Sequence, residues 1–203
     1  MRLMKEEGLT SNVRMKKYRS YRGDVGKIAP DLLRRDFRAS KPAQKWVTDV
    51  TEFSLHGHKL YLSPILDLFN GEIVSYTLSE RPVLQSVLDM LKTALSTLPK
   101  DSNLIFHSDQ GWQYQHKTFQ KLLKDKNVQQ SMSRKGNCLD NSVMESFFAV
   151  LKSELLYLQS FDSLEHFKSE LIQYIHYYNN DRIKLKLNGM SPVDYRAHSF
   201  SSA

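Results

Sequence analysis

The chain has 203 residues, 40% of them apolar and 25% charged, a composition typical of a globular protein large enough to bury a core. Its apolar runs are too short to cross a membrane, and Met1 does not begin a recognisable signal peptide. The single cysteine, Cys138, excludes an internal disulfide and a cysteine-based zinc finger. We therefore expect one main domain with an appendage, no membrane contact and a cytoplasmic location.

The net charge of +7 is concentrated near the N-terminus, because residues 1–45 hold 13 Lys and Arg against 5 Asp and Glu. Basic side chains there are interleaved with Tyr18 and Tyr21, a pattern that suits phosphate contacts beside aromatic packing on sugars or bases. A solvated basic tail is the alternative. We expect a basic arm at 1–44 ahead of a body at 45–198, and we expect residues 14–45 to contact DNA with little packing of their own. The candidate DNA contacts in the arm are Lys16, Lys17, Arg19 and Arg22.

The body opens with signals for three strands. Residues 45–55 alternate and are rich in β-branched and aromatic side chains, and residues 59–69 follow after a short break. Asn70-Gly71 is a strong hairpin signal and precedes a third stretch at 72–79. These segments predict an antiparallel meander.

Helices and strands then alternate. The helical period and the turn residues predict helices at 83–98, 116–126, 139–158 and 163–178 and strands at 103–109 and 128–133. The order is βββαβαβα with a trailing helix. It predicts an α/β fold with a mixed five-stranded sheet covered by helices, as in ribonuclease-H-like proteins.

Three acidic residues are candidates for one site. Asp49 lies within the first expected strand, Asp109 ends the buried run NLIFHSD, and Glu145 follows with 35 residues in between. Carboxylate oxygens are hard ligands suited to Mg²⁺ or Mn²⁺. Two such ions, about 3.5–4 Å apart, can activate an attacking oxygen and stabilise a leaving one in phosphodiester chemistry.

Each acid also has a structural interpretation. Asp49 could lie on a solvated strand face, and Asp-Gln-Gly at Asp109 is also turn chemistry. Ser142 and Glu145 fit a capping box, in which the glutamate only fixes a helix start. The helical wheel instead places Asn141, Glu145 and Lys152 on one stripe. In that case Lys152 could hold a DNA phosphate.

Other polar residues fit structural roles better. Asp67 precedes the hairpin, so a turn-stabilising role is expected. His107 could assist the site or could be a hydrogen-bonded histidine at a strand end. His56 and His58 flank a glycine without a third histidine nearby, which favours a loop over a metal site.

The stretches WVTDVTEF, HSDQGWQY, SMSRKGNCLDNSVMESFFAVLKSE and YYNNDRIKLKLNGMSP together resemble the integrase core of bacterial insertion-sequence transposases. The match is to OrfB-type, DDE-type proteins of the IS-three family, relatives of retroviral integrases, and extends over about residues 16–196. The resemblance implies that Asp49, Asp109 and Glu145 are the catalytic metal ligands and that Lys152 is the family's basic residue.

The resemblance further implies a ribonuclease-H-like fold, Mg²⁺ or Mn²⁺, cleavage at element ends and strand transfer by a 3′ hydroxyl. Its expected partners are element-end and target DNA, further copies of the chain on DNA, and a helix-turn-helix protein from an upstream frame. A nucleoid-associated location follows. Arg134, Lys135 and Arg182 are further candidates for DNA contact.

One departure from the family concerns the N-terminus, where MRLMKEEGL is similar to only the tail of a helix-turn-helix region. Two other functions compete with that of a transposase, since the acids alone do not separate it from a nuclease and the short N-terminus leaves room for a relic. One is a ribonuclease-H-like nuclease without strand transfer. The other is a truncated relic that binds or regulates element ends, although such a relic would be expected to have lost one of the three acids.

Overall fold

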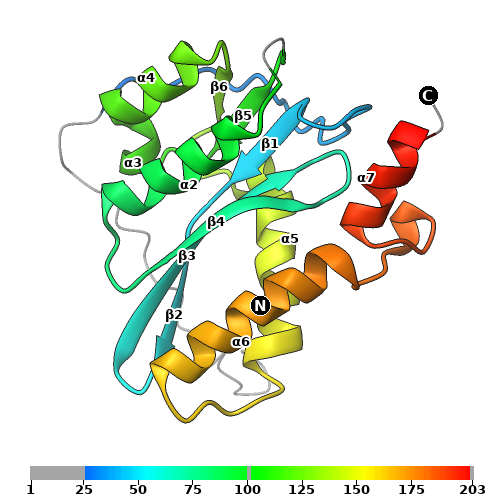
Figure 1. The fold of residues 1–203 in the computed structure, drawn as a ribbon. Helices are drawn as coiled ribbons and strands as arrows, with labels where there is room; N and C mark the ends of the chain where they lie inside the picture. Colours follow the sequence, from blue (N-terminus) through cyan, green and yellow to red (C-terminus); the bar gives the residue numbers. More distant parts are fainter. Residues whose placement is uncertain (1–25, 100–101, 202–203) are drawn as a thin grey trace, which may run out of the picture.

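A computed structural model describes residues 26–99 and 102–201 and shows an α/β/α sandwich (Figure 1). The strands are β1 Lys45–Thr48, β2 Thr51–Leu55, β3 His58–Asp67, β4 Ile73–Ser79, β5 Ile105–Ser108 and β6 Gln129–Met132. They form one mixed sheet, ordered β2-β3-β1-β5-β6, with β4 on the other side of β3. The expected ribonuclease-H-like architecture is confirmed, and the meander is antiparallel as predicted.

The first expected strand is divided into β1 and β2 by a two-residue break at Asp49 and Val50. Both parts pair with β3 in one continuous antiparallel register, so Asp49 falls opposite Pro64. Proline has no N–H to contribute to a ladder, which explains why regular pairing is interrupted there. The sheet thus counts six strands where five were predicted, because a single chain segment contributes two.

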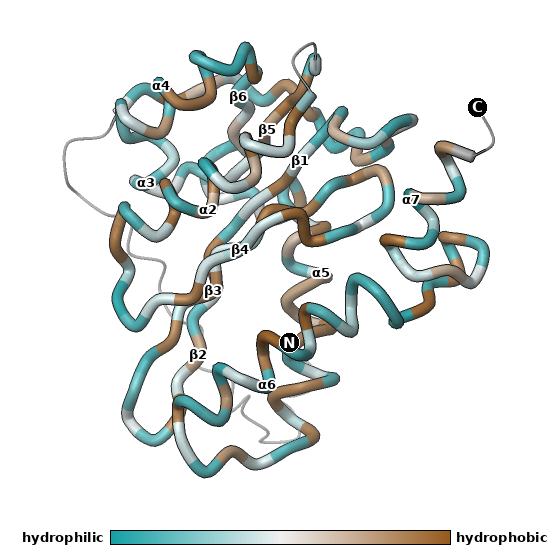
Figure 2. Tube along the Cα trace, viewed as in Figure 1, coloured by the Kyte–Doolittle hydropathy of each residue, from teal (hydrophilic) through white to brown (hydrophobic). Residues whose placement is uncertain are grey.

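Hydrophobic residues recur along these strands (Figure 2) and form a core on each face of the sheet. On one face lie α2 Leu84–Ser96, α3 Trp112–Gln115 and α4 Lys117–Asp125, and on the other lie α5 Ser142–Leu151 and α6 Leu164–Asn180. Trp46 and Val47, adjacent in β1, face opposite cores. This alternation follows from the two-residue period of a strand.

The C-terminal half differs from the expected pattern in two places. The predicted helix at 139–158 is a 3₁₀ turn, Cys138–Asn141, then α5, then a π-helical segment, Lys152–Leu156. The sequence reading missed α3, which is a single turn, and α7 Pro192–Ser201. A second short 3₁₀ turn, Leu185–Leu187, joins α6 to α7.

The described part of the basic arm, residues 26–44, packs on the body at Leu33, a contact that the sequence did not predict. Leu33 is 2% exposed and belongs to the hydrophobic core. The backbone N–H groups of Leu32 and Leu33 donate to the Ser131 hydroxyl. The arm's candidate DNA contacts, Lys16, Lys17, Arg19 and Arg22, lie outside the described residues. Across the two described ranges, no helix is both long and apolar enough to span a membrane.

Candidate active site

The site begins where β1 ends, at Asp49. Its Oδ1 accepts a hydrogen bond from the next backbone N–H, that of Val50, at 2.7 Å. Asp49 is partly buried in the sheet rather than on a solvated strand face. The solvated-face interpretation of this residue is therefore not what the structure shows.

Asp109 is brought beside Asp49 by the parallel pairing of β1 with β5. The register pairs Lys45 with Ile105 and Val47 with His107, and continuing it by two positions sets Asp49 opposite Asp109. Neighbouring strands lie about 4.8 Å apart. The two carboxylates thus occupy adjacent positions where β1 and β5 end.

Gly111 fixes the orientation of the Asp109 carboxylate. Its backbone N–H donates to Asp109 Oδ1 at 2.8 Å, so the Asp-Gln-Gly turn is present as well. A Cβ at position 111 would lie 2.9 Å from the same oxygen. A side chain at this position would therefore crowd Asp109 and, at 2.7 Å, the amide of Gln113, a role of the HSDQG glycine that the sequence reading did not assign.

Glu145 lies in the first turn of α5, the helix that packs against β1. The N-cap of this helix is Asn141, and within the described residues no side chain caps it. The capping-box alternative, which requires Ser142 at the N-cap, is therefore not observed. Glu145 is exposed, whereas the helix buries Met144 and Phe147 on its other side.

The negative charges of the three acids interact, and this interaction changes the pKa of Asp49. Burial, the charge of Asp109 and the charge of Glu145 together raise the pKa of Asp49 to about 7. Burial also raises the pKa of Asp109. Burial and the charges of Asp49 and Asp109 raise the pKa of Tyr114, which keeps its phenol protonated beside the acids.

The donor set suits a hard divalent cation, because it consists only of carboxylate oxygens. A bound cation would also neutralise the negative charges that repel one another here. The three carboxylates do not converge on a single position, however. Within residues 26–99 and 102–201, no group of three or more His, Cys, Asp or Glu side chains is close enough together to form a ready metal site. The three acids are neighbours, with Glu145 on the solvent side.

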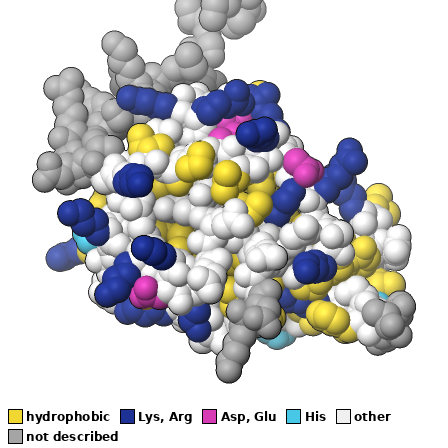
Figure 3. Space-filling view, turned by 90° about the horizontal axis from the view of Figure 1, so that it is seen from above, with side chains coloured by type: hydrophobic (Ala, Val, Ile, Leu, Met, Phe, Trp, Pro, Cys, Tyr) yellow, Lys and Arg dark blue, Asp and Glu magenta, His cyan; other side chains and the backbone are white. Residues whose placement is uncertain are grey.

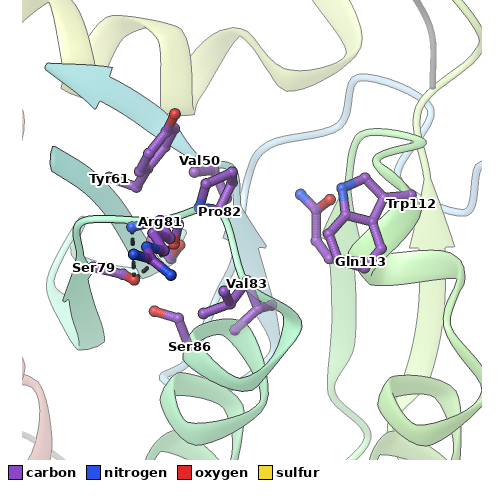
Figure 4. A pocket seen from close by; sticks show the side chains of 11 residues that line it. Val50, Tyr61, Ser79, Arg81, Pro82, Val83, Ser86, Trp112 and Gln113 are labelled. Carbon is purple, nitrogen blue, oxygen red and sulfur yellow. Dashed lines mark hydrogen bonds between the residues drawn. The ribbon is translucent and has the colours of Figure 1, made fainter. Parts of the chain in front are cut away.

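A pocket is lined in part by residues that follow Asp49 and Asp109 in the sequence (Figure 4). Val50, next to Asp49, forms one wall, and Trp112 and Gln113 of α3 stand on the opposite side. Tyr61 and Arg81 contribute an aromatic ring and a cation to the lining. The sequence reading did not single out these residues as a pocket, because they come from four separate segments of the chain.

Lys152 lies in the π-helical segment rather than on the α-helical stripe assumed for it. Its Nζ is 5.6 Å from the centre of the Phe53 ring in β2. The ring and the charge attract each other, so the side chain is directed back onto the sheet. Lys152 is half-buried there.

The other candidate DNA contacts of the body differ in how free they are. Arg134 donates from Nε and Nη2 to the carboxylate of Asp140, both at 2.8 Å. Arg182 donates from Nε to Glu154 at 2.8 Å. Lys135 is exposed and has no ion pair with any described residue. Lys and Arg side chains predominate over acids on the face shown in Figure 3.

Asp67 and His56 have the structural surroundings expected of them, and His107, for which two roles were open, is held by hydrogen bonds. Asp67 is fully buried and accepts hydrogen bonds at the hairpin, including one from the Phe69 N–H. His107 is buried, with Nδ1 2.8 Å from the Ser131 hydroxyl. His56 lies in the turn before β3, with Nε2 2.6 Å from the carbonyl oxygen of Phe161.

Comparison with known proteins identifies the family. The integrase core domain matches residues 39–138, and a second integrase core domain family matches residues 145–200. A putative transposase, InsK, of insertion sequence element IS150 from Escherichia coli K12 is 52% identical over 199 residues, which are 98% of this chain and 70% of that protein. A transposase-like protein from Haemophilus influenzae is 50% identical, covering 98% of this chain and 92% of its own length.

Solved structures show the same fold. The HTLV-2 integrase catalytic core domain, in complex with magnesium, aligns with a TM-score of 0.59 and 16% identity, over 78% of this chain and 99% of that one. The integrase of a simian T-cell lymphotropic virus intasome aligns with a TM-score of 0.61 and 19% identity, over 78% of this chain and 55% of that one. With its two integrase-core matches and its close transposase relatives, the chain belongs to the DDE-type integrase-core transposases of bacterial insertion sequences.

Proposed function

We propose that the chain is the catalytic subunit of an insertion-sequence transposase and that Asp49, Asp109 and Glu145 are its catalytic residues. The observation that carries this assignment is the register of β1 and β5, which sets the first two acids side by side. The third acid stands on a helix packed against β1, close enough to raise the pKa of Asp49.

The chemistry proposed is cleavage of a DNA strand at the element end, followed by attack of the freed 3′ hydroxyl on target DNA. Asp49 and Asp109 would hold Mg²⁺ or Mn²⁺ at the strand ends, and Glu145 would complete the ligand set. Two bound ions would supply activation of the attacking oxygen and stabilisation of the leaving one. The protein has to position the phosphodiester and hold the carboxylates in their ionised form. A bound cation would favour the ionised form of Asp49 and so counteract the rise in its pKa.

DNA is the proposed partner, and several copies of the chain are expected to assemble on it. The pocket shown in Figure 4 offers Trp112 and Tyr61 for stacking or apolar contact and Arg81 for a phosphate. Lys135 is an exposed cation in the loop that leads to α5. Lys152, in the π-helical segment that follows α5, is proposed to hold the phosphate next to the one attacked.

A paired assay of binding and cleavage on element-end DNA tests the proposal. Glu145→Gln should abolish cleavage with either Mg²⁺ or Mn²⁺ while keeping DNA affinity, because it removes a ligand charge and little shape. Asp89→Asn, an exposed acid on α2, is the control and should cleave like the parent. Cleavage retained by Glu145→Gln would show that the site assignment is wrong.

A further inference from the structure

Asn141, at the start of α5, ties this helix to the strand that carries Asp49. Its Nδ2 donates to the carbonyl oxygen of Thr48 at 3.2 Å. Thr48 is the last residue of β1 and directly precedes Asp49. Because Glu145 follows Asn141 by about one helical turn, this hydrogen bond links the backbone positions of two of the three acids.

Asp140, the preceding residue, makes the corresponding link to the strand that carries Asp109. Its carbonyl oxygen lies 2.9 Å from Nε2 of the buried His107. His107 stands on β5, two residues before Asp109, and its Nδ1 is held by Ser131 of β6. Two consecutive residues at the helix start are therefore bonded to the two strands that end at the other acids.

The carboxylate of Asp140 is itself held by hydrogen bonds, which fix the start of α5 in place. It is 1% exposed and accepts hydrogen bonds from Nε and Nη2 of Arg134 and from Nε of Arg35, each at 2.8 Å. Charge-assisted hydrogen bonds of this kind are short and strong. Arg35 comes from the described part of the basic arm, so three chain segments meet at Asp140.

Stability does not account for the amide of Asn141. The residue is 5% exposed, and its Oδ1 is buried without a hydrogen-bond partner among the described residues. A buried acceptor left unpaired destabilises a fold, whereas an apolar side chain of the same shape does not. The amide is thus better explained by the bond that its Nδ2 makes to Thr48.

We propose that Asn141 and Asp140 are positioning residues, which set the place of the Glu145 carboxylate relative to Asp49 and Asp109. The proposal rests on the proposed function of the three acids. Neither residue is a metal ligand in this account. Each acts through the backbone of the helix start, and loss of the link would let α5 shift relative to the ends of β1 and β5.

Asn141→Leu is the decisive variant, because leucine approximates the shape of asparagine and removes both the bond to Thr48 and the unpaired Oδ1. Mn²⁺ affinity, measured by calorimetry without DNA, should fall about 10-fold, as is usual when the support of a metal ligand is lost. Cleavage with Mg²⁺ should fall by a similar factor. The Tm of the metal-free protein should be unchanged or higher, and DNA affinity should be retained.

Asn179→Leu is the matched control. The amide of Asn179 on α6 bonds both the N–H and the carbonyl oxygen of Ile73 on β4, away from the acids. This variant should lower the Tm and leave Mn²⁺ affinity unchanged. It therefore separates a loss of general stability from a loss of ligand placement.

The parent and Glu145→Gln complete the series. If Glu145→Gln weakens Mn²⁺ binding while Asn141→Leu matches the parent in both Mn²⁺ affinity and cleavage, the positioning role is overturned and the acid site stands. If the parent binds no Mn²⁺, or Glu145→Gln binds it like the parent, the proposed site itself fails and the positioning role falls with it.

Discussion

Two carboxylates of the same sheet, the fully buried Asp67 and the partly buried Asp49, have opposite surroundings. Asp67 ends β3 and is completely enclosed, yet both its oxygens are satisfied by donors from separate parts of the chain. These donors are the backbone N–H groups of Ala43 and Phe69, the indole N–H of Trp46 and the guanidinium of Arg196. Burial raises the pKa of Asp67, and these donors oppose the rise.

Asp49 ends a neighbouring strand but receives a hydrogen bond only from the Val50 N–H that follows it, as far as the described residues show. Its other neighbours include Asp109 and Glu145, two further negative charges. A buried carboxylate surrounded by donors stabilises the scaffold, whereas a carboxylate beside like charges is stabilised when a proton or a cation joins it. This difference separates a structural acid from a candidate catalytic one.

The largest effect expected from the comparison is on catalysis. Asp109→Asn should reduce DNA cleavage on the order of 10³-fold, because a neutral amide replaces a charged ligand at the reacting phosphate. Affinity for element-end DNA, measured by fluorescence anisotropy without metal, should be kept. An Asp109→Asn protein that cleaves at the parent rate would place the chemistry elsewhere.

Asp67→Ala should produce the largest loss of stability. It leaves the Trp46 indole, two backbone N–H groups and the Arg196 guanidinium without their acceptor, at a cost of about 3 kcal/mol in the free energy of unfolding. Urea denaturation measures this loss. A loss below about 1 kcal/mol would mean that the enclosed carboxylate does not hold the hairpin.

Asp49→Asn should instead stabilise the metal-free protein, in a pH-dependent way. The folded-state pKa of Asp49 is raised to about 7, so its carboxyl favours folding below about pH 4 and loses that contribution as the pH rises to 7. The gain from Asp49→Asn should therefore be near zero at pH 4 and reach roughly 1–3 kcal/mol at pH 8. Thermal unfolding in chelator at both pH values measures it, and a pH-independent gain would contradict the raised pKa.

Lys152→Ala should have the smallest effect. Arg196 contacts the buried Asp67 directly, whereas Lys152 lies over the Phe53 ring. Removal of its charge should weaken DNA binding and cleavage by about 1 kcal/mol or less, and Lys152→Arg should recover most of the loss. If Lys152→Ala binds and cleaves like the parent, the residue contacts no phosphate.

The sequence predicted the meander and the alternation of helices and strands, because the apolar periods of both are strong. The three acids could be selected because Asp49 interrupts an apolar strand pattern, Asp109 ends a buried run and Glu145 lies on a helix opposite its apolar arc. The break at Asp49 was not predicted, since the residue opposite it, Pro64, is set by the register of β3 across the sheet. The side chains around Asp140 were also missed, because their partners come from distant segments.

The ion pairs of Arg134 and Arg182 show the same limit. Both arginines lie in basic stretches of the sequence, and a DNA contact was predicted for each. Their partners, Asp140 and Glu154, are identified only by the folded chain. Composition reveals an excess of positive charge but does not distinguish cations already paired within the protein from those free to bind a phosphate.

The most direct test of the acid site is a crystal of the parent chain soaked in Mn²⁺, with data collected where manganese scatters anomalously. The account predicts anomalous peaks between Asp49 and Asp109, with carboxylate oxygens at about 2 Å, and the Glu145 carboxylate moved toward them. Peaks confined to other acids, or an empty map at the ends of β1 and β5 in crystals that bind Mn²⁺ elsewhere, would contradict it.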